Sequence, residues 1–206
     1  MTAFITGNPT FTTAELAGLA LQHFGRQGSI RPLPSERDQN ARLSCDGQDY
    51  VLKIANAAED TGQIDLQNAT MLHLACVGQP GIPRVVPTLS GADRALVDIN
   101  GRPSPLRLVT WVSGTPLAET PRGIPQLTNL GRFMGGLTRS MQGFGHPQAF
   151  RPDFPWSLDH VIQLRDHAED IADPARRDMV KRLFARYEAQ VLPRLPGLRA
   201  SVLHQD

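Results

Sequence analysis

The chain has 206 residues, of which 40% are hydrophobic, so it is long enough for one ample core or for two small lobes. Its 21 Lys and Arg side chains nearly balance its 20 Asp and Glu side chains, which leaves a formal net charge of +1. This balance argues against nucleic acid or an anionic membrane surface as a partner. Small molecules are the partners that we expect.

Cysteine usage and the first residues favour a cytoplasmic protein. Cys45 and Cys76 form neither a metal-ligand spacing nor a disulfide framework, so we expect both thiols to be reduced. The start of the sequence lacks the basic residues and unbroken apolar stretch of a signal peptide. No apolar run approaches the roughly 20 residues that a membrane helix needs, so we expect a soluble, cytoplasmic chain.

The first 54 residues predict a helix followed by three short strands. Thr12 and Glu15 have the spacing of a capping box, and the apolar residues after them keep one helical face up to Gly25. From 29 to 54 short extended runs alternate with polar turns, of which 45–48 (Cys-Asp-Gly-Gln) is the tightest. This pattern is typical of an antiparallel sheet.

The third extended run, 49–54, carries a lysine on its less apolar face. Side chains alternate between the two faces of a strand, so Val51 and Lys53 lie together, opposite the more apolar set. A helix over 62–77 follows, with the apolar stripe Ile64, Met71, Leu72 and Ala75, and Gly78 is its stop signal.

Two further strands are predicted over 95–99 and 106–112, with Asn100-Gly101 as the hairpin turn between them. The sheet then has about five strands. After it, the sequence predicts helices over 126–142 and 157–171, and a last one from Asp173 to about 192. The order of elements is that of an α+β protein with two lobes.

The last residues, 201–206, form a short apolar run that ends in His204-Gln205-Asp206. By itself this ending is equally typical of a buried strand that stops at polar residues. It is preceded, however, by a strand lysine, a helix, a β-hairpin, a Gly-containing linker and further helices, in that order. With this order the chain resembles the aminoglycoside phosphotransferase (APH) superfamily, whose catalytic loop begins with an apolar run and His-Gly-Asp. Gln205 stands in place of the usual Gly.

The resemblance covers nearly the whole chain and is strongest for the hydroxylysine kinase-like branch, where His-Gln-Asp is familiar. The segments 66–69 (Leu-Gln-Asn-Ala) and 154–158 (Phe-Pro-Trp-Ser-Leu) also resemble that branch. The resemblance implies a protein kinase-like two-lobed fold. The implied domains are a nucleotide-binding N-lobe over 1–112, a hinge or linker over 113–125 and an incomplete helical C-lobe over 126–206.

The resemblance also implies three chemical roles. Asp206 would accept a hydrogen bond from the substrate hydroxyl and take its proton, whereas His204 would brace the backbone of the catalytic loop. Lys53 would contact the α and β phosphates of a nucleotide. Without the resemblance, a lysine that extends from a sheet edge into water is the alternative for Lys53.

Other positions would complete the implied nucleotide site. The family supports its lysine with a carboxylate on the next helix, where Asp65 has the charge but a short reach and Gln67 can only hydrogen-bond. Val51 would lie over the base ring, and backbone groups of Thr110 and Val112 would form hydrogen bonds with the edge of the base.

The loop 34–40 lies where a nucleotide-covering loop is expected, although it contains no glycine. Ser35 and Asn40 can offer donors to phosphate there, and an ordinary solvated turn is an equal alternative. His160 and His167 lie seven residues apart on one predicted helix, too far to share a metal ion, so we assign them no metal.

The sequence ends at the implied catalytic aspartate. In the family an asparagine five residues later and a further aspartate hold the metal ions that bridge the phosphates. We therefore expect a fragment that is inactive alone, with ATP or GTP as its nucleotide and Mg²⁺ bound only in a longer parent. Since members of the branch also occur ahead of aminotransferase-type domains, a downstream PLP-dependent domain is one expectation for that parent.

Two hypotheses about function follow. In the first, the parent is a kinase that transfers the γ-phosphate of ATP or GTP to a hydroxyl of a small amine or amino-acid-like substrate. Hydroxylysine-like acceptors are favoured, and aminoglycoside, choline-like and homoserine-like acceptors stay open. In the second, the chain is a nucleotide-binding or interaction module without turnover.

Overall fold

The structure is a computed structural model that describes residues 8–121, 123–150 and 158–204. The described residues fall into two compact units. One runs to Gln148 and includes Leu203 and His204, and the other runs from Ala149 to Val202. The division into lobes about a linker at 113–125 stays a prediction.

The first helix has the ends that its sequence predicts. α1 (Thr13–Phe24) begins after Thr12, whose hydroxyl accepts from the Glu15 amide while the Glu15 carboxylate accepts from the Thr12 amide. It ends at Gly25, whose φ of 63° lies in the left-handed region that glycine adopts without strain. The predicted capping box and stop are thus confirmed.

An antiparallel sheet follows α1. Its strands are β1 (Ser29–Leu33), β2 (Gln39–Cys45), β3 (Gln48–Ile54), β4 (Val85–Val86), β5 (Ala95–Ile99) and β6 (Arg102–Thr110). Their order is β1-β2-β3-β6-β4, and β5 also pairs with β6. The sheet has six strands instead of about five, because β4 is only two residues long and carries no alternation to detect.

Two tight turns fix the register of this sheet. Asp46 and Gly47 have φ values of 51° and 70°, and Asn100 and Gly101 have values of 54° and 80°. Two successive positive φ values are what a two-residue hairpin turn needs, and they match the right-handed twist of the strands it joins. Both predicted turns are therefore confirmed.

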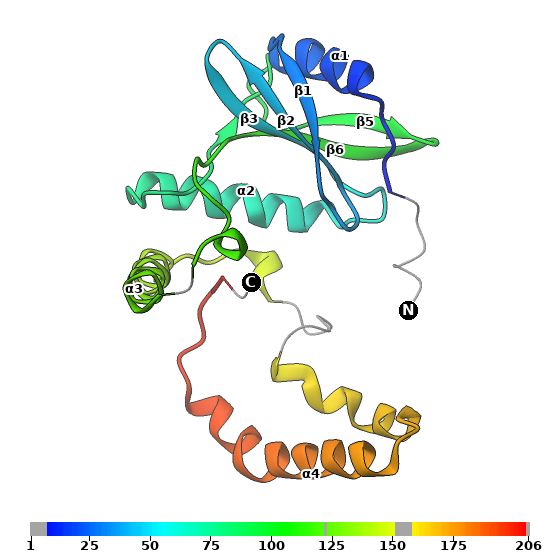
Figure 1. Ribbon diagram of the computed structural model, residues 1–206, viewed down its shortest axis with the longest axis vertical. Coiled ribbons are helices and arrows are strands. Elements are labelled where there is room, and N and C mark those ends of the chain that lie inside the picture. Colours follow the sequence, from blue (N-terminus) through cyan, green and yellow to red (C-terminus); the bar gives the residue numbers. More distant parts are fainter. Residues whose placement is uncertain (1–7, 122, 151–157, 205–206) are drawn as a thin grey trace. The chain divides into compact units, whose positions relative to one another are not determined.

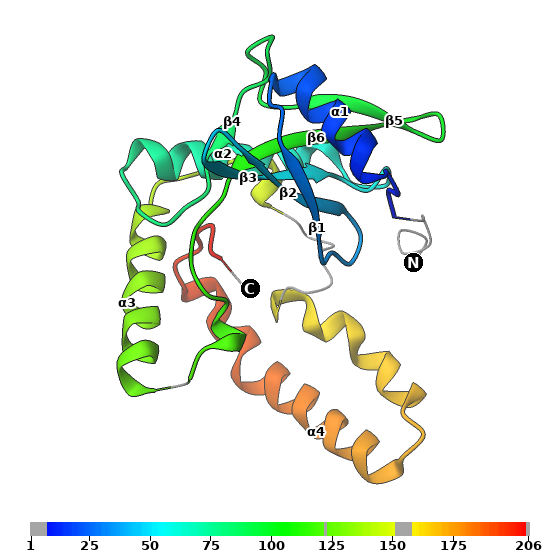
Figure 2. The same cartoon turned by 45° about the horizontal axis from the view of Figure 1, so that its top comes forward.

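The two faces of the sheet are covered differently. α1 lies on one face and α2 (Thr61–Cys76) lies on the opposite face (Figure 1, Figure 2). The α1 face carries a closed apolar cluster: Leu16, Ala20, Phe24, Ala41, Leu43, Cys45, Tyr50, Leu52, Ile54, Val97, Leu106 and Leu108. Strand alternation turns Val51 and Lys53 away from this cluster, toward the α2 side, as predicted.

The buried face of α2 matches the predicted stripe only at Ile64. The N-cap of α2 is Asp60, whose carboxylate accepts from the amide of Gly62. The residues that it buries are Gln63, Ile64, Asn68 and Leu74, whereas Leu72, part of the predicted apolar stripe, is 65% exposed. The prediction was wrong in part because the sheet face that α2 meets is itself polar, so polar side chains of the helix turn inward.

The remaining elements are helical. The first unit adds the short turn η2 (Leu117–Glu119) and the long helix α3 (Ile124–Ser140), and the turn η3 (Pro147–Ala149) crosses from the first unit into the second. A hydrogen bond of 2.7 Å joins the His73 ring on α2 to the Ser140 carbonyl at the end of α3. None of the described helices combines the length and the apolar character that crossing a membrane requires.

The second unit consists of η4 (Leu158–Asp170), α4 (Pro174–Gln190) and η5 (Leu192–Gly197). Asp173 caps α4, as its sequence predicts, by accepting from the amide of Ala175. η4 and α4 lie side by side and are joined by the ion pairs Arg165 to Glu188 at 2.6 Å and Lys181 to Glu169 at 2.5 Å. The predicted N-cap of η4, Ser157, lies outside the described residues.

Candidate active site

A row of polar side chains crosses the α2 side of the sheet. Lys53 on β3 is paired in register with Asn40 on β2 and with Arg107 on β6. The Lys53 Nζ donates to the Asn40 Oδ1 at 3.0 Å, and the Asn40 Nδ2 donates to the Ser35 Oγ at 3.1 Å. The structure thus brings together three residues that the sequence singled out separately, Ser35, Asn40 and Lys53.

Arg107 is the member of this row that sequence reasoning missed. Its side chain is buried, with 3% of the residue exposed. Its Nη1 donates to the Asn68 Oδ1 at 3.0 Å and its Nη2 donates to the Gln67 Oε1 at 2.7 Å, so it joins β6 to α2. The sequence held a signal, because an arginine between Leu106 and Leu108 interrupts an apolar strand.

The electrostatics of the row are dominated by burial of positive charge. Burial lowers the pKa of the Lys53 ammonium below its ordinary value, and the neighbouring Arg107 lowers it further, against a weaker opposite effect of Asp38. Burial likewise lowers the pKa of the Arg107 guanidinium, which Asp38 and Asp93 partly offset. Two cations therefore share a site in which Asp38, Asp93 and Glu59 act on them from beyond ion-pair distance.

The predicted support for Lys53 from α2 is absent from the described part of the chain. Asp65 forms an ion pair with Arg94, on the loop before β5. Gln67 accepts from Arg107 and not from Lys53. The physical reason is that the side-chain amide of Gln67 is already bonded to the guanidinium of Arg107, on the strand next to that of Lys53.

A second row, beside the first, is more apolar. Val51 is half-buried and pairs with Val109 on β6 and with Arg42 on β2. The Arg42 guanidinium lies over the Trp111 ring, 4.6 Å from its centroid, and is ion-paired with Asp49. Trp111 is a flat apolar surface that the sequence reasoning did not use.

The predicted hinge residues, Thr110 to Val112, lie at the end of β6, beside this row. The amide of Thr110 donates to the Arg84 carbonyl at 2.9 Å, and its hydroxyl accepts from the Arg84 amide. The amide of Trp111 donates to the Asp49 carbonyl at 3.1 Å. Val112 lies just beyond, 46% exposed. The Thr110 amide is thus already used within the sheet, and its carbonyl is the group that it can offer to a ligand.

The two predicted catalytic residues lie at the end of the sequence. His204 is exposed and lies in an irregular segment. Asp206 lies outside the described residues, so its predicted role stays a prediction.

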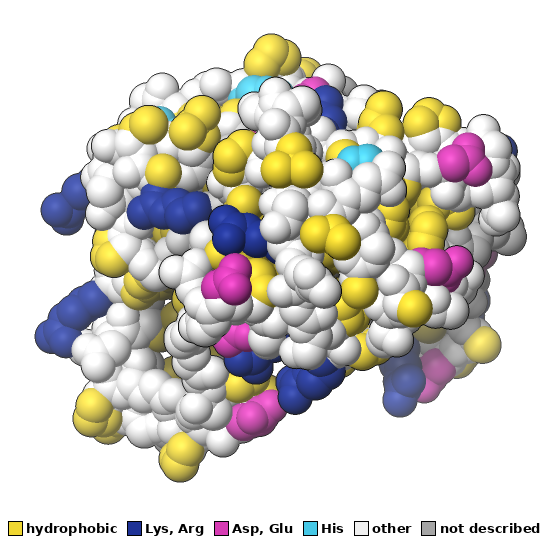
Figure 3. Space-filling view, turned by 90° about the horizontal axis from the view of Figure 1, so that it is seen from above, with side chains coloured by type: hydrophobic (Ala, Val, Ile, Leu, Met, Phe, Trp, Pro, Cys, Tyr) yellow, Lys and Arg dark blue, Asp and Glu magenta, His cyan; other side chains and the backbone are white. Residues whose placement is uncertain are grey.

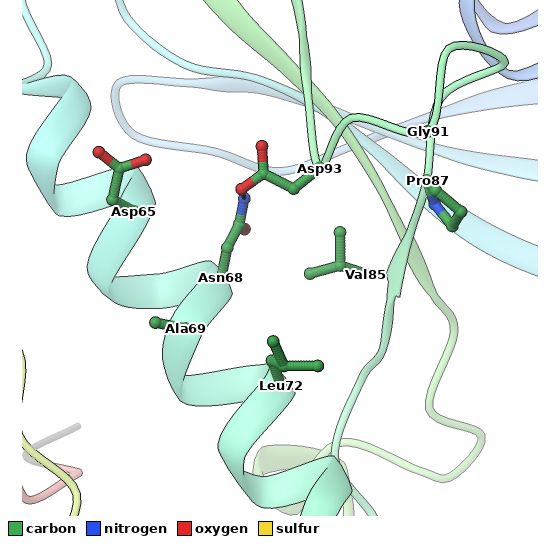
Figure 4. A pocket seen from close by; sticks show the side chains of 8 residues that line it. All are labelled: Asp65, Asn68, Ala69, Leu72, Val85, Pro87, Gly91 and Asp93. Carbon is green, nitrogen blue, oxygen red and sulfur yellow. Dashed lines mark hydrogen bonds between the residues drawn. The ribbon is translucent and has the colours of Figure 1, made fainter.

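A cavity of about 410 Å³ lies between α2 and the segment from β4 to Asp93, and Lys53 does not line it. Asp65, Asn68, Ala69 and Leu72 of α2 line it, facing Val85, Pro87, Gly91 and Asp93 (Figure 4). The Asn68 Nδ2 donates to the Asp93 Oδ2 at 2.8 Å, while its other amide atom accepts from Arg107. Asn68 therefore links the wall of the cavity to the cationic row, and among the predicted site residues that the structure describes only Asp65 borders the cavity.

The model of the APH phosphotransferase enzyme family matches residues 29–206, which is most of the chain. The chain belongs to this family. The suspected resemblance is thereby confirmed.

Curated members of the family that resemble this chain include hydroxylysine kinases. The protein from Mus musculus is 27% identical over 219 residues, covering 98% of this chain and 58% of that protein. The protein from Danio rerio is 29% identical over 210 residues, covering 96% of this chain and 59% of that protein. The chain thus spans about three fifths of the length of these relatives.

A solved structure confirms the predicted fold class. The amicoumacin kinase hAmiN, in complex with AMP-PNP, Ca²⁺ and Ami, has a TM-score of 0.65 and 15% sequence identity. The match covers 93% of this chain and 55% of that chain. The antiparallel sheet with its helices is therefore the α+β fold of APH kinases.

Proposed function

We propose that this protein is a small-molecule kinase that transfers the γ-phosphate of ATP or GTP to a hydroxyl of a small amine or amino-acid-like substrate. The observation that carries the proposal is the row Asn40, Lys53 and Arg107, a partly buried cationic site on one face of a sheet. Such a site is suited to the phosphates of a nucleotide, because cations in a water-poor place attract anions more strongly than they do in water. Membership of the phosphotransferase family supports the same assignment.

The neighbouring row is suited to the nucleoside. Val51 and Trp111, both partly exposed, offer apolar surface beside the cations, and a base ring stacks favourably on such surface. The edge of a purine base carries donors and acceptors. The Thr110 carbonyl and the Val112 amide, two residues along the chain, are the backbone groups that we assign to it.

The residues divide the work of phosphoryl transfer. Its transition state is loose, so a kinase mainly positions two substrates and neutralises charge. Lys53 would hold the α and β phosphates, and Ser35 and Asn40 would keep the Lys53 ammonium in place. Asp206 would accept the proton of the attacking hydroxyl, and His204 would brace its loop.

Hydroxylysine is the acceptor that we test first. Curated relatives from Mus musculus and Danio rerio carry the name hydroxylysine kinase. hAmiN, in contrast, is named an amicoumacin kinase, so the substrates named for proteins with this fold differ. Mg²⁺ would supply neutralisation of the phosphate charge when bound, through residues that the family carries after the position of Asp206.

The decisive experiment is turnover by the protein expressed from its complete reading frame. ATP or GTP would be supplied with 5-hydroxylysine, and nucleoside diphosphate release measured for the wild type and Asp206→Asn. Turnover that depends on hydroxylysine and falls at least about a thousandfold in the variant would support the kinase assignment. Nucleotide binding without transfer to hydroxylysine, amino alcohols or aminoglycosides would instead identify a binding module without turnover.

A further inference from the structure

Two positively charged side chains stand next to each other on the α2 side of the sheet. Lys53 and Arg107 occupy paired positions on β3 and β6. Cβ atoms of directly paired residues lie about 5 Å apart, and like charges at such positions destabilise the sheet. The arrangement is therefore unfavourable unless something compensates it.

The partners of both cations are neutral. Lys53 donates to the amide oxygen of Asn40, and Arg107 donates to the amide oxygens of Gln67 and Asn68. Within the described residues, neither cation has a carboxylate at ion-pair distance. The carboxylate of α2 that comes nearest in sequence, Asp65, is paired with Arg94 instead.

A buried cation whose hydrogen-bond partners are all amides is costly, because amides satisfy its hydrogen bonds but not its charge, and Asp38 and Asp93 offset that charge only in part. Arg107 is 3% exposed, so water does little to screen it. An anionic ligand at the more accessible Lys53 would compensate both charges at once. A single carboxylate carries one negative charge, whereas the di- or triphosphate of a nucleotide carries several on adjacent groups.

We propose that Lys53 and Arg107 together form the polyphosphate-binding centre, with Lys53 as the contacting group and Arg107 as a positioning residue that supplies a second charge from beneath. The inference rests on the nucleotide site proposed above and adds a residue and a division of labour to it. Arg107 holds α2 to the sheet through Gln67 and Asn68, so the Lys53 ammonium is left for the phosphates.

The discriminating variant is Gln67→Glu. A carboxylate at position 67 would keep the contact with Arg107 and strengthen it, but would also cancel the charge of Arg107. If that charge serves the phosphates, ATP and inorganic tripolyphosphate should bind about tenfold more weakly, whereas adenosine should bind within about twofold of the wild type. If Arg107 only anchors the helix, ATP affinity should hold or improve, which would overturn the proposal.

Two variants of Arg107 complete the series, measured by titration calorimetry on the protein expressed from its complete reading frame. Arg107→Met should lower the affinity for ATP by more than about tenfold and leave the affinity for adenosine nearly unchanged. Arg107→Lys, which keeps the charge, should recover most of the lost ATP affinity. Equal losses of ATP and adenosine in Arg107→Met would show a purely architectural role and would contradict the proposal.

Arg94→Met is the matched control, because it removes another cation bound to α2, through Asp65, without touching the row. It should change ATP affinity by less than about threefold. A loss as large as that of Arg107→Met would overturn the assignment to Arg107. A wild type that binds no nucleotide would overturn the proposed function itself, whereas nucleotide binding that is indifferent to Arg107 would overturn only this inference.

Discussion

The two faces of the sheet are closed by opposite kinds of chemistry. On the α1 side, the contacts are apolar, and residues such as Leu16, Leu52 and Leu108 are at most 2% exposed. On the α2 side, Arg107, Gln67 and Asn68 join the sheet to the helix through hydrogen bonds. The first face is built for stability, since burial of apolar surface is its main contribution.

The second face retains polar groups that a purely structural interface would not need. Buried polar and charged groups contribute little net stability, and apolar residues of similar volume often replace them without loss. The ligand-binding role proposed above for this face accounts for their presence. On the outer surface seen from above, in contrast to the two sheet faces, apolar side chains are scattered among charged and polar ones (Figure 3).

The largest difference between the faces should appear in the free energy of unfolding when neighbouring side chains of β3, one on each face, are shortened to alanine. Leu52→Ala removes a side chain that is 1% exposed and should lower the free energy of unfolding by about 2–5 kcal/mol. Val51→Ala, its neighbour on the half-buried α2 side, should cost about 1 kcal/mol. Urea unfolding followed by circular dichroism measures both. Equal losses would contradict the contrast between the faces.

A smaller effect should show which cation anchors α2. Arg107→Met leaves the amide oxygens of Gln67 and Asn68 without their donor and should cost about 1–3 kcal/mol of unfolding free energy. Lys53→Met, the matched control, affects only the half-buried Asn40 and should cost less than about 0.5 kcal/mol. The same urea titrations decide the point, and a greater loss for Lys53→Met would assign the anchor to the lysine.

Removal of the N-cap of α1 tests how much local hydrogen bonding, as opposed to apolar packing, stabilises the α1 side. Thr12→Ala removes the hydroxyl that accepts from the Glu15 amide and should lower the unfolding free energy by about 1 kcal/mol. Thr13→Ala, at the exposed next position inside the helix, is its control and should be nearly neutral. Thermal unfolding compares the two, and a neutral Thr12 variant would mean that packing alone holds α1.

The smallest expected effect is the pH dependence of the polar side. Because the pKa of folded Lys53 lies below 10.5, its ordinary value, the folded chain releases this proton before the unfolded chain does. The contribution of Lys53 to stability should therefore rise with pH in that window, since the unfolded state binds more protons there.

Affinity should change in the opposite direction. As pH rises through the lowered pKa, Lys53 loses its charge, so ATP should bind more weakly while adenosine is unaffected. Calorimetric titrations at a series of pH values measure this, with Lys53→Met as the control that should show a flatter profile. An identical profile in that variant would exclude Lys53 as the titrating group.

Local sequence signals predicted the apolar side well. The cap at Thr12, the stop at Gly25 and the turn at Asn100-Gly101 are set by neighbours in the chain, so the pattern alone locates them. Strand alternation also placed Val51 and Lys53 on one face. β4, with two residues, was too short to leave a pattern.

The polar side was predicted less well because its contacts join distant parts of the chain. Which side chain meets Gln67 depends on how α2 crosses the sheet, and nothing within the helix sequence records that Arg107, 40 residues later, is the partner. The predicted apolar stripe of α2 was wrong in part for the same reason. The arginine within the apolar run of β6 was the one local signal for this contact.

β6 pairs with three strands, with β3 along Leu106–Thr110, with β5 along Arg102–Leu106 and with β4 at Leu108 and Val109. Its amides can exchange with solvent only when several ladders separate, so their protection should report global unfolding, whereas α2 can open locally. Arg107 belongs to this most protected strand. The charge beneath the phosphate site should therefore stay in place through openings that release the helix, and an incoming nucleotide would meet a preformed cation even while α2 fluctuates.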